Sequence, residues 1–215
     1  MALKVNEIFF SIQGESSYAG RPCVFVRLTG CNLRCSYCDT QYAYEEGEEL
    51  EIANIVERVT SHRCPLVEVT GGEPLIQEET PMLINRLLEK DYEVLMETNG
   101  SQDINRVDDR CVKVVDIKCP SSGHSGDNEL ENLYRLTSHD EVKFVIADRN
   151  DYEYAKQILN LMATNTFGEN AVHFSPAYGR IEPKTLAEWI LEDHLDVRLH
   201  LQLHKVIWMP YQGGV

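Results

Sequence analysis

Residues 31–38 read Cys-Asn-Leu-Arg-Cys-Ser-Tyr-Cys and place three thiols, Cys31, Cys35 and Cys38, in one short loop. The spacing is C-x3-C-x2-C, and thiolates are the preferred ligands of iron–sulfur clusters and zinc. Three cysteines leave one iron of a 4Fe-4S cubane without a protein ligand. An open coordination position lets a metal centre bind a substrate or cosubstrate. The stretch therefore predicts an open 4Fe-4S cluster.

Structural zinc is the alternative for the same three thiols. A structural zinc site needs four closed ligands, and His62 and Cys64 are candidates for completing the set. No second closely spaced Cys/His pair follows them in the sequence. The spacing therefore favours the open cluster over zinc.

The composition fits a reducing compartment. The chain has 215 residues and seven cysteines, with no signal peptide and no apolar run of membrane length, so we expect one cytoplasmic domain, residues 1–215. With 35 acidic and 20 basic residues, the formal net charge is −15. Such a surface repels phosphate backbones, and neither nucleic acid nor a membrane is an expected partner.

Strands and helices alternate along the chain. Runs of β-branched and aromatic residues predict strands over 5–12, 22–29, 66–70, 92–96, 111–117, 141–146, 171–175 and 197–203. Apolar periodicity and helix-start signals predict helices over 51–62, 80–90, 128–138, 151–163 and 183–195, and residues 42–51 are expected to form an exposed loop. Seven strands from residue 22 onward are too few for a closed eightfold barrel. The expected fold is α/β, a partial, open barrel of mostly parallel strands.

The distinctive loops follow the predicted strands. In a parallel barrel, functional groups gather at the C-terminal ends of the strands. The cysteine loop and residues 71–74, 97–100 and 118–123 all fall there. Adjacent glycines expose backbone amides and carbonyls, which suits a zwitterionic amino-acid ligand. We therefore expect one rim to carry the site.

Three polar features lie near the first strands, and each has two interpretations. Residues 13–17 offer donors and acceptors beside a glycine, or form a solvated turn. Arg27 either pairs with a carboxylate such as Glu15 or faces a cavity to bind an anionic ligand. Asp39 and Thr40 either ligate a hard cation such as Mg²⁺ or form an Asx-type turn.

Several motifs together resemble one family. They are Gln13-Gly14-Glu15, Gly20-Arg21-Pro22, Phe25-Val26-Arg27, Cys38-Asp39-Thr40, Thr70-Gly71-Gly72-Glu73-Pro74, Glu97-Thr98-Asn99-Gly100 and Leu203-His204-Lys205. The cysteine spacing resembles the radical S-adenosylmethionine (SAM) superfamily, and the Gln-Gly-Glu and Cys-Asp-Thr motifs narrow the resemblance to the 7-carboxy-7-deazaguanine synthases. The resemblance covers essentially the whole chain. Two departures are Ser16, where the family usually has glycine, and residues 208–215, which match less closely.

The resemblance implies a lyase that converts 6-carboxy-5,6,7,8-tetrahydropterin to 7-carboxy-7-deazaguanine with release of ammonia, on the route to queuosine and related 7-deazapurines. The implied cofactors are a 4Fe-4S cluster, SAM and Mg²⁺. The reduced cluster would cleave SAM, and the 5′-deoxyadenosyl radical would abstract hydrogen from C6 before the ring contracts. A flavodoxin- or ferredoxin-type electron donor and a homodimer are also implied.

The same resemblance assigns site residues but no catalytic side chain beyond the cofactors. Cys31, Cys35 and Cys38 would hold the cluster, and Thr40 would ligate Mg²⁺. The expected SAM residues are Tyr37, Cys38, Asp39, Gly72, Glu73, Glu97, Asn99, Lys118, Pro120 and Ser121. The expected substrate residues are Ile12, Gln13, Gly14, Glu15, Arg27, Thr70, His204 and Pro210.

Two other functions remain open at this point. A glycyl-radical-enzyme activase is also a radical SAM protein, but the Gln-Gly-Glu motif and Thr40 weigh against it. A non-enzymatic iron–sulfur carrier or zinc-binding module belongs to a different class, and it would not need a glycine-rich rim. Reductive cleavage of SAM and turnover of the pterin distinguish the three.

Overall fold

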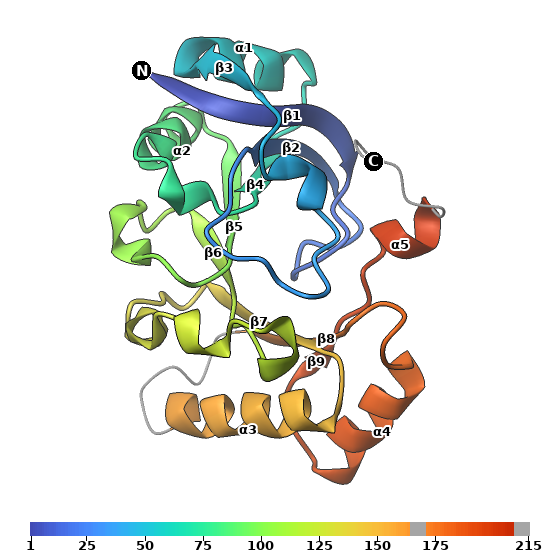
Figure 1. Cartoon of the computed structure of the whole chain (residues 1–215). Helices are drawn as coiled ribbons and strands as arrows, with labels where there is room; N and C mark the ends of the chain where they lie inside the picture. The colour runs from blue at the N-terminus through green and yellow to red at the C-terminus, as the bar shows by residue number, and fades with distance from the viewer. Residues whose placement is uncertain (164–170, 209–215) are drawn as a thin grey trace.

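The computed structural model describes residues 1–163 and 171–208. Within these residues a single nine-stranded sheet runs in the order β3-β1-β2-β4-β5-β6-β7-β8-β9 (Figure 1). β2 and β4 to β9 are parallel, whereas β1 pairs antiparallel with both β2 and β3. The two edge strands, β3 and β9, do not pair with each other, so the barrel is open.

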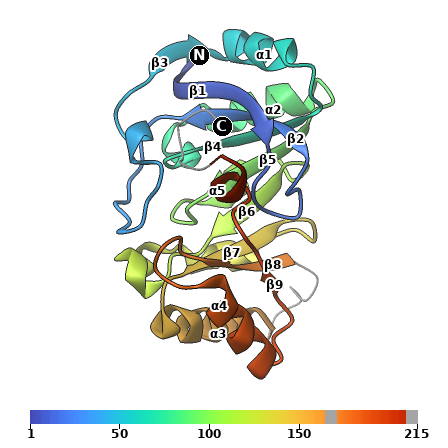
Figure 2. The ribbon, with the colours of Figure 1, turned by 90° about the vertical axis from the view of Figure 1, so that its right-hand side faces the viewer.

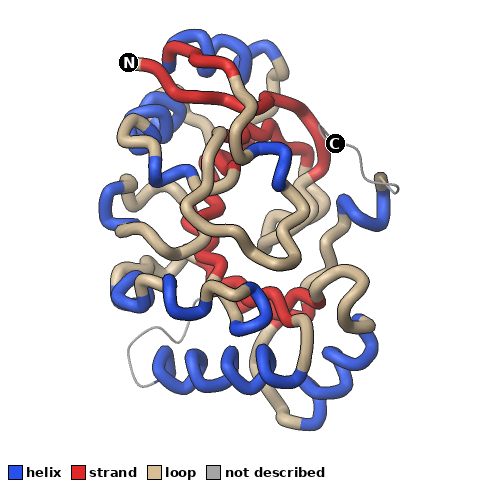
Figure 3. Tube along the Cα trace, viewed as in Figure 1, coloured by secondary structure: helices blue, strands red, loops and turns tan. Residues whose placement is uncertain are grey.

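The strands are β1 (Ala2–Ile12), β2 (Pro22–Leu28), β3 (Glu48–Glu51), β4 (Leu66–Gly71), β5 (Glu93–Thr98), β6 (Val112–Asp116), β7 (Glu141–Ile146), β8 (Ala171–Pro176) and β9 (Arg198–Leu199). The α-helices are α1 (Ile52–Ser61), α2 (Thr80–Leu88), α3 (Arg149–Ala163), α4 (Pro183–Glu192) and α5 (His204–Ile207). Figure 3 shows the larger helices on the outside of the sheet and long loops passing in front of it.

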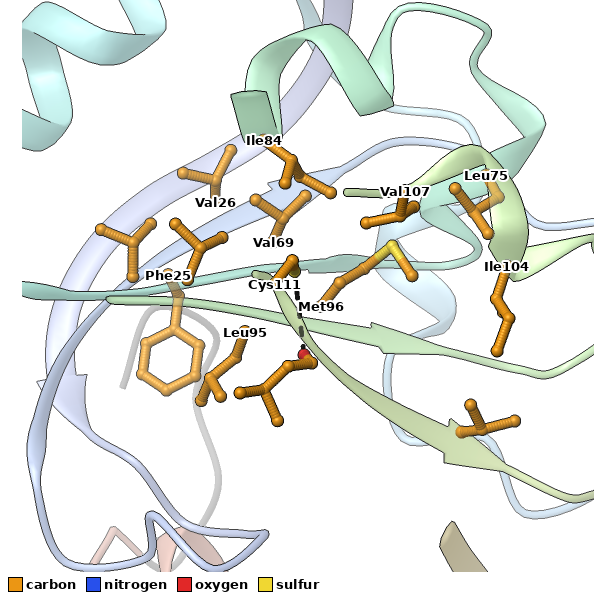
Figure 4. Packing of buried hydrophobic residues seen from close by; sticks show 14 of the residues in the cluster. Phe25, Val26, Val69, Leu75, Ile84, Leu95, Met96, Ile104, Val107 and Cys111 are labelled. Carbon is orange, nitrogen blue, oxygen red and sulfur yellow. Dashed lines mark hydrogen bonds between the residues drawn. The ribbon is translucent and has the colours of Figure 1, made fainter. Parts of the chain in front are cut away.

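The sheet has an apolar outer face and a mixed inner face that carries the polar strand positions. In Figure 4, Val26 and Val69 point toward Ile84 of α2 and Met96 extends toward Val107, whereas Phe25 and Leu95 point to the other side of the sheet. All five belong to the buried core. Because side chains alternate along a strand, the residues next to the outward valines face the barrel interior. The strands thereby present their polar positions to the inside.

The predicted open barrel with mostly parallel strands is confirmed, including seven parallel strands from residue 22 onward. The sequence interpretation missed β3, which lies in the segment expected to be a loop. β3 pairs with the start of β1, with Leu50 opposite Leu3. Four residues rich in glutamate carry little strand signal, and only the partner strand makes them one.

The prediction of a helix over residues 128–138 is wrong. Two short 3₁₀ turns, Ser125–Asp127 and Leu130–Tyr134, occupy this region. The Asn128 side chain bonds both backbone groups of Lys118, at 2.8 and 2.9 Å, and Asn132 donates to the carbonyls of Gly100 and Gln102. Asparagine side chains that bond distant backbone in this way compete with helix formation.

The last predicted strand is shorter than expected, because the chain leaves the sheet after Leu199 and turns toward the first loop. The His200 amide still donates to Phe174 O at 2.9 Å, and the Leu203 amide then donates to Gly14 O at 3.0 Å. Figure 2 shows the resulting position of α5, between the half of the sheet that carries β1 and the edge that carries β9. This turn brings His204 to the barrel interior.

None of the helices in residues 1–163 and 171–208 is both long enough and apolar enough to cross a membrane.

Candidate active site

A cavity of about 520 Å³ lies at the C-terminal ends of the parallel strands, and all three loop thiols line it. Fourteen other predicted site residues line it as well: Ile12, Gln13, Gly14, Glu15, Arg27, Tyr37, Asp39, Thr40, Thr70, Gly72, Glu97, Asn99, Lys118 and His204. Segments from both ends of the described chain therefore meet around one space.

Three predicted residues lie outside the cavity lining, and a fourth is not among the described residues. Glu73, Pro120 and Ser121 do not line the cavity, and Pro210 lies outside the described residues. Glu73 is fully buried beneath the rim, where its carboxylate accepts from the Asn99 amide at 2.6 Å and from Thr98 Oγ1 at 2.9 Å. It thus joins the loops that follow β4 and β5. The Ser121 amide donates to Asp151 at 2.8 Å.

The cysteine loop is held by its neighbours through backbone and hydroxyl groups. Ser36 Oγ donates to Ser121 O at 2.6 Å, and Arg180 donates to Ser36 O at 2.9 Å. On the other side Gly72 packs so closely that a Cβ there would lie 2.2 Å from Gly30 O and 2.6 Å from Cys31 Cβ. Only glycine fits this approach, which fixes the glycine-rich loop against the cysteine loop.

The three thiols fit an open 4Fe-4S cluster in number and chemistry, because a cubane with three thiolate ligands keeps one iron free for another ligand. Within the described residues, no three or more His, Cys, Asp or Glu side chains surround a point suited to one metal ion.

Two buried polar atoms at the cavity wall fit a bound ligand. The Tyr37 hydroxyl and Asp116 Oδ1 have no hydrogen-bond partner among the described residues. The other Asp116 oxygen pairs with Lys118 Nζ at 2.7 Å. Buried polar groups are normally hydrogen-bonded, so a ligand is the expected partner of both atoms. Both lie on the same cavity as the thiols, as a SAM site requires.

The interior holds one cation between two acids. Lys143 Nζ on β7 lies 2.6 Å from Glu97 Oε1 and also contacts the Glu15 carboxylate. Burial works against the charged form of Lys143, but the charges of Glu15 and Glu97 outweigh it and hold its pKa above the usual range. Burial would also raise the pKa of Glu15, but Lys143 and His204 lower it. Lys143 and Glu15 are therefore held in their charged forms, whereas burial raises the pKa of Glu97 against the opposing charge of Lys143.

Arg27 combines both of its expected roles. Its Nε donates to Glu7 Oε1 at 2.7 Å, and the Tyr42 hydroxyl donates to the same oxygen at 3.0 Å. The ion pair is with Glu7 on β1, directly across the strand pair, and not with Glu15. The guanidinium also lines the cavity. Glu7 thus orients a cation that faces the ligand space.

The proposed magnesium residues lie beside the C-terminal segment. Thr40 Oγ1 donates to Asp39 Oδ1 at 3.0 Å, and Asp39 pairs with Lys205 at 2.6 Å. His204 lies against Gly14 so closely that a Cβ on Gly14 would be 2.5 Å from His204 Nδ1. Burial lowers the pKa of His204, although the charges of Glu15 and Asp39 oppose that shift. His204 is therefore neutral near pH 7.

The sequence interpretation missed three charged residues of this interior, Glu7, Glu68 and Lys143. Each stands in a strand, and two of them interrupt strongly apolar runs, Leu-Val-Glu-Val-Thr at 66–70 and Glu-Val-Lys-Phe-Val at 141–145. A lone charge in a buried parallel strand is costly unless it is paired. A single charged residue within an apolar strand was therefore the signal that could have identified them as site residues. The same signal identified Arg27 in the sequence analysis.

Comparison with known proteins agrees with this geometry. The Radical SAM superfamily model matches residues 25–167, more than half of the chain. The 7-carboxy-7-deazaguanine synthase of Koribacter versatilis is 46% identical, with 99% of this chain and 100% of the relative covered. The one from Chlorobaculum tepidum is also 46% identical, with 99% and 97% covered.

Solved structures show the same fold. QueE from Escherichia coli has a TM-score of 0.77 at 22% identity, with 94% of each chain covered. Streptococcus suis SuiB, solved with S-adenosylmethionine, has a TM-score of 0.54 at 11% identity, over 80% of this chain and 45% of its own. These likenesses concern the fold, whereas the full-length relatives fix the family. The chain belongs to the 7-carboxy-7-deazaguanine synthase family of the radical SAM superfamily.

Proposed function

We propose that this protein is a lyase that converts 6-carboxy-5,6,7,8-tetrahydropterin to 7-carboxy-7-deazaguanine and ammonia. One observation carries the proposal beyond the family name: a single cavity brings the three loop thiols together with Gln13, Glu15, Arg27 and His204. Thiols alone would serve a carrier as well. A cavity of about 520 Å³ with ionic groups beside those thiols suits a small polar substrate held next to a cofactor.

As a radical SAM protein, the chain uses a 4Fe-4S cluster and SAM. When bound, they supply a 5′-deoxyadenosyl radical that removes hydrogen from C6 of the pterin. We assign Cys31, Cys35 and Cys38 to the cluster. For SAM we assign Tyr37 and Lys118 at the cavity wall, with Glu73 and Ser121 acting behind it as supports of the rim.

The protein itself binds and orients the substrate. Arg27, fixed by Glu7, would pair with the carboxylate of the pterin, which needs a local cation in a chain of net charge −15. The Glu15 carboxylate, held ionised by Lys143, would accept from the donor-rich edge of the fused ring. His204 lines the same cavity and contacts Gly14.

Replacing Arg27 by alanine should raise the Michaelis constant for the carboxypterin. Losing one charge-assisted contact costs about 1.5–3 kcal/mol, or roughly ten- to a hundredfold in affinity. SAM binding and iron content should stay near those of the parent. Arg58→Ala, which removes an exposed ion pair on α1, is the matched control. Unchanged carboxypterin affinity by anaerobic calorimetry would make Arg27 a structural partner of Glu7 only.

We also propose Thr40 as a ligand of Mg²⁺, supported by its place at the cavity beside the Asp39 carboxylate. Thr40→Ala removes one neutral oxygen ligand, so half-maximal turnover should need several-fold more Mg²⁺ while folding is unaffected. The measurement is turnover against added Mg²⁺ after chelation, with Thr185→Ala on α4 as control. Parent turnover that ignores Mg²⁺ would leave Thr40 with a turn-forming role.

The function is tested by anaerobic incubation of the reduced, reconstituted protein with SAM and the carboxypterin. Mass spectrometry should find 5′-deoxyadenosine, methionine, 7-carboxy-7-deazaguanine and ammonia. SAM cleavage that the pterin does not stimulate, with radical formation on a partner protein, would instead indicate a glycyl-radical-enzyme activase. Absence of any SAM cleavage would indicate a carrier.

The remaining assignments follow from the family. We propose that residues 1–215 act as one radical SAM domain in the cytoplasm and that two copies form a homodimer. The electron that reduces the cluster would come from a flavodoxin- or ferredoxin-type protein. Size-exclusion chromatography with light scattering tests the dimer, and reduction of the cluster by each donor class tests the partner.

A further inference from the structure

Glu68 is a buried acid at the cavity wall for which the mechanism above has no use. It lies in the middle of β4, and its flanking residues, Val67 and Val69, are fully buried in the core. Glu68 itself is 5% exposed and lines the cavity, on the same face of the strand as Thr70. Because Thr70 is closer to the strand end, Glu68 sits one layer deeper in the barrel.

The Glu68 carboxyl is held at one oxygen only. Oε2 accepts a short hydrogen bond from Gln13 Nε2, and Gln13 Oε1 accepts from the Glu15 amide at 3.1 Å. Gln13 is 2% exposed, so its amide is committed to these two bonds. The other oxygen of Glu68, Oε1, has no hydrogen-bond partner among the described residues. A buried acid presented in this way is available to a ligand.

The surroundings of Glu68 disfavour its negative charge. Glu15 from the first loop, Glu97 from β5 and the buried Cys23 thiol from β2 lie near it, and Lys143 from β7 is the facing cation. Lys143 already pairs with both other acids. Burial, and then the charge of Glu97, raise the pKa of Glu68 to about 8, although Gln13 and Lys143 act in the other direction.

The proposed reaction needs a group that can both give and take a proton. Once the ring has contracted and 5′-deoxyadenosine has returned the hydrogen removed from C6, the species has the composition of the substrate, and it must lose ammonia. The departing nitrogen takes the electron pair of its C–N bond and needs one proton. A ring carbon then loses one proton as the five-membered ring becomes aromatic. This elimination needs no oxidant or reductant.

We propose that Glu68 is the general acid and base of the ammonia-releasing step. As a carboxylic acid it gives its proton to the departing nitrogen while the C–N bond breaks. As a carboxylate it then takes the proton from the ring carbon, whose C–H electron pair enters the aromatic ring. Both protons are accounted for, and the acid is regenerated. The inference rests on the proposed function.

Glu68→Gln keeps the size and the hydrogen-bonding capacity of the side chain and removes its proton. Carboxypterin affinity and the transfer of the C6 hydrogen to 5′-deoxyadenosine should stay within about twofold of the parent, whereas product and ammonia formation should fall about a hundredfold. An isomer of the carboxypterin, equal to it in mass and separated from it by chromatography, should accumulate. Glu57→Gln, the same change at an exposed position of α1, should alter none of these quantities.

The pH profile gives a second, independent readout. Product formation by the parent should fall as the pH rises through about 8, because Glu68 then loses the proton that it must donate. The residual rate of Glu68→Gln should lack this limb. If the variant does not retain its iron, Glu68→Asp replaces it, and this variant should keep the limb at a reduced rate.

Full product formation by Glu68→Gln, or a parent profile without a basic limb near pH 8, overturns the proposal. A parent that makes no 7-carboxy-7-deazaguanine overturns the proposed function instead. The two failures are distinguishable, because the proposed function fails only if the parent makes no product at any pH.

Discussion

The Cys35→Ala protein is expected to cleave no SAM and to lack the broad visible absorbance of an iron–sulfur cluster. Cys35 is the middle thiol of the 31–38 loop, and all three thiols line one cavity. A cubane that keeps a free position for SAM has three protein ligands, so the loss of one leaves two irons uncoordinated by the chain. Cys31→Ala and Cys38→Ala should behave in the same way.

Cys64→Ala is the matched control for these variants. Cys64 is also buried, but its thiol contacts Pro22 O at 3.3 Å and lies outside the cavity lining. Absorbance and SAM cleavage should both survive in Cys64→Ala, and also when Cys23 or Cys111 is replaced. If the Cys35→Ala protein still made 5′-deoxyadenosine from SAM, the cluster assignment would be wrong.

The second large effect is expected for Lys143→Met, which should lower the free energy of unfolding by about 3–5 kcal/mol at pH 8. Lys143 is 5% exposed and is the shared partner of Glu15 and Glu97. Removing it leaves two partly buried carboxylates without their cation. The loss should be measured by anaerobic urea unfolding, with Lys184→Met as control, because Lys184 has an 86% exposed side chain.

The stability deficit of Lys143→Met should shrink toward pH 5. In the parent, burial favours the neutral form of Glu15, but Lys143 and His204 keep its pKa lowered. A lowered carboxyl pKa stabilises the fold above the pKa of the unfolded chain, and that stability is lost as the pH falls. Without Lys143, only His204 and Gln202 oppose the effect of burial on Glu15, and protonation relieves the acids that have lost their cation. Equal deficits at pH 5 and pH 8 would contradict this account.

The parallel strands from β2 to β8 were predictable because each one carries its own apolar run. β4 and β7 are readable from five or six consecutive residues. The helix expected near 128–138 failed for the opposite reason. No helix forms there because the side chains of Asn128 and Asn132 bond distant backbone. Asn128 bonds Lys118, 10 residues away, and Asn132 bonds Gln102 and Gly100, 30 and 32 residues away. Periodicity within the segment cannot reveal such bonds.

Some residues of the candidate site could be predicted from the sequence, and others could not. Residues in short motifs, such as Glu15 and Thr70, were identified from neighbours in the sequence. Glu7, Glu68 and Lys143 contact partners that are distant in the sequence, and which residues meet depends on how the strands are paired. Strand pairing is a property of the folded sheet. It therefore cannot be predicted from the residues of one strand alone.

The contact between Gly14 and His204 has a consequence for biosynthesis. It joins the first loop of the chain to the segment after β9, and no Cβ fits between them. A chain emerging from the ribosome therefore presents the cysteine loop, residues 31–38, long before His204. A nascent or truncated chain that ends before residue 204 keeps all three cluster thiols but lacks the part of the cavity wall that His204 and Lys205 supply.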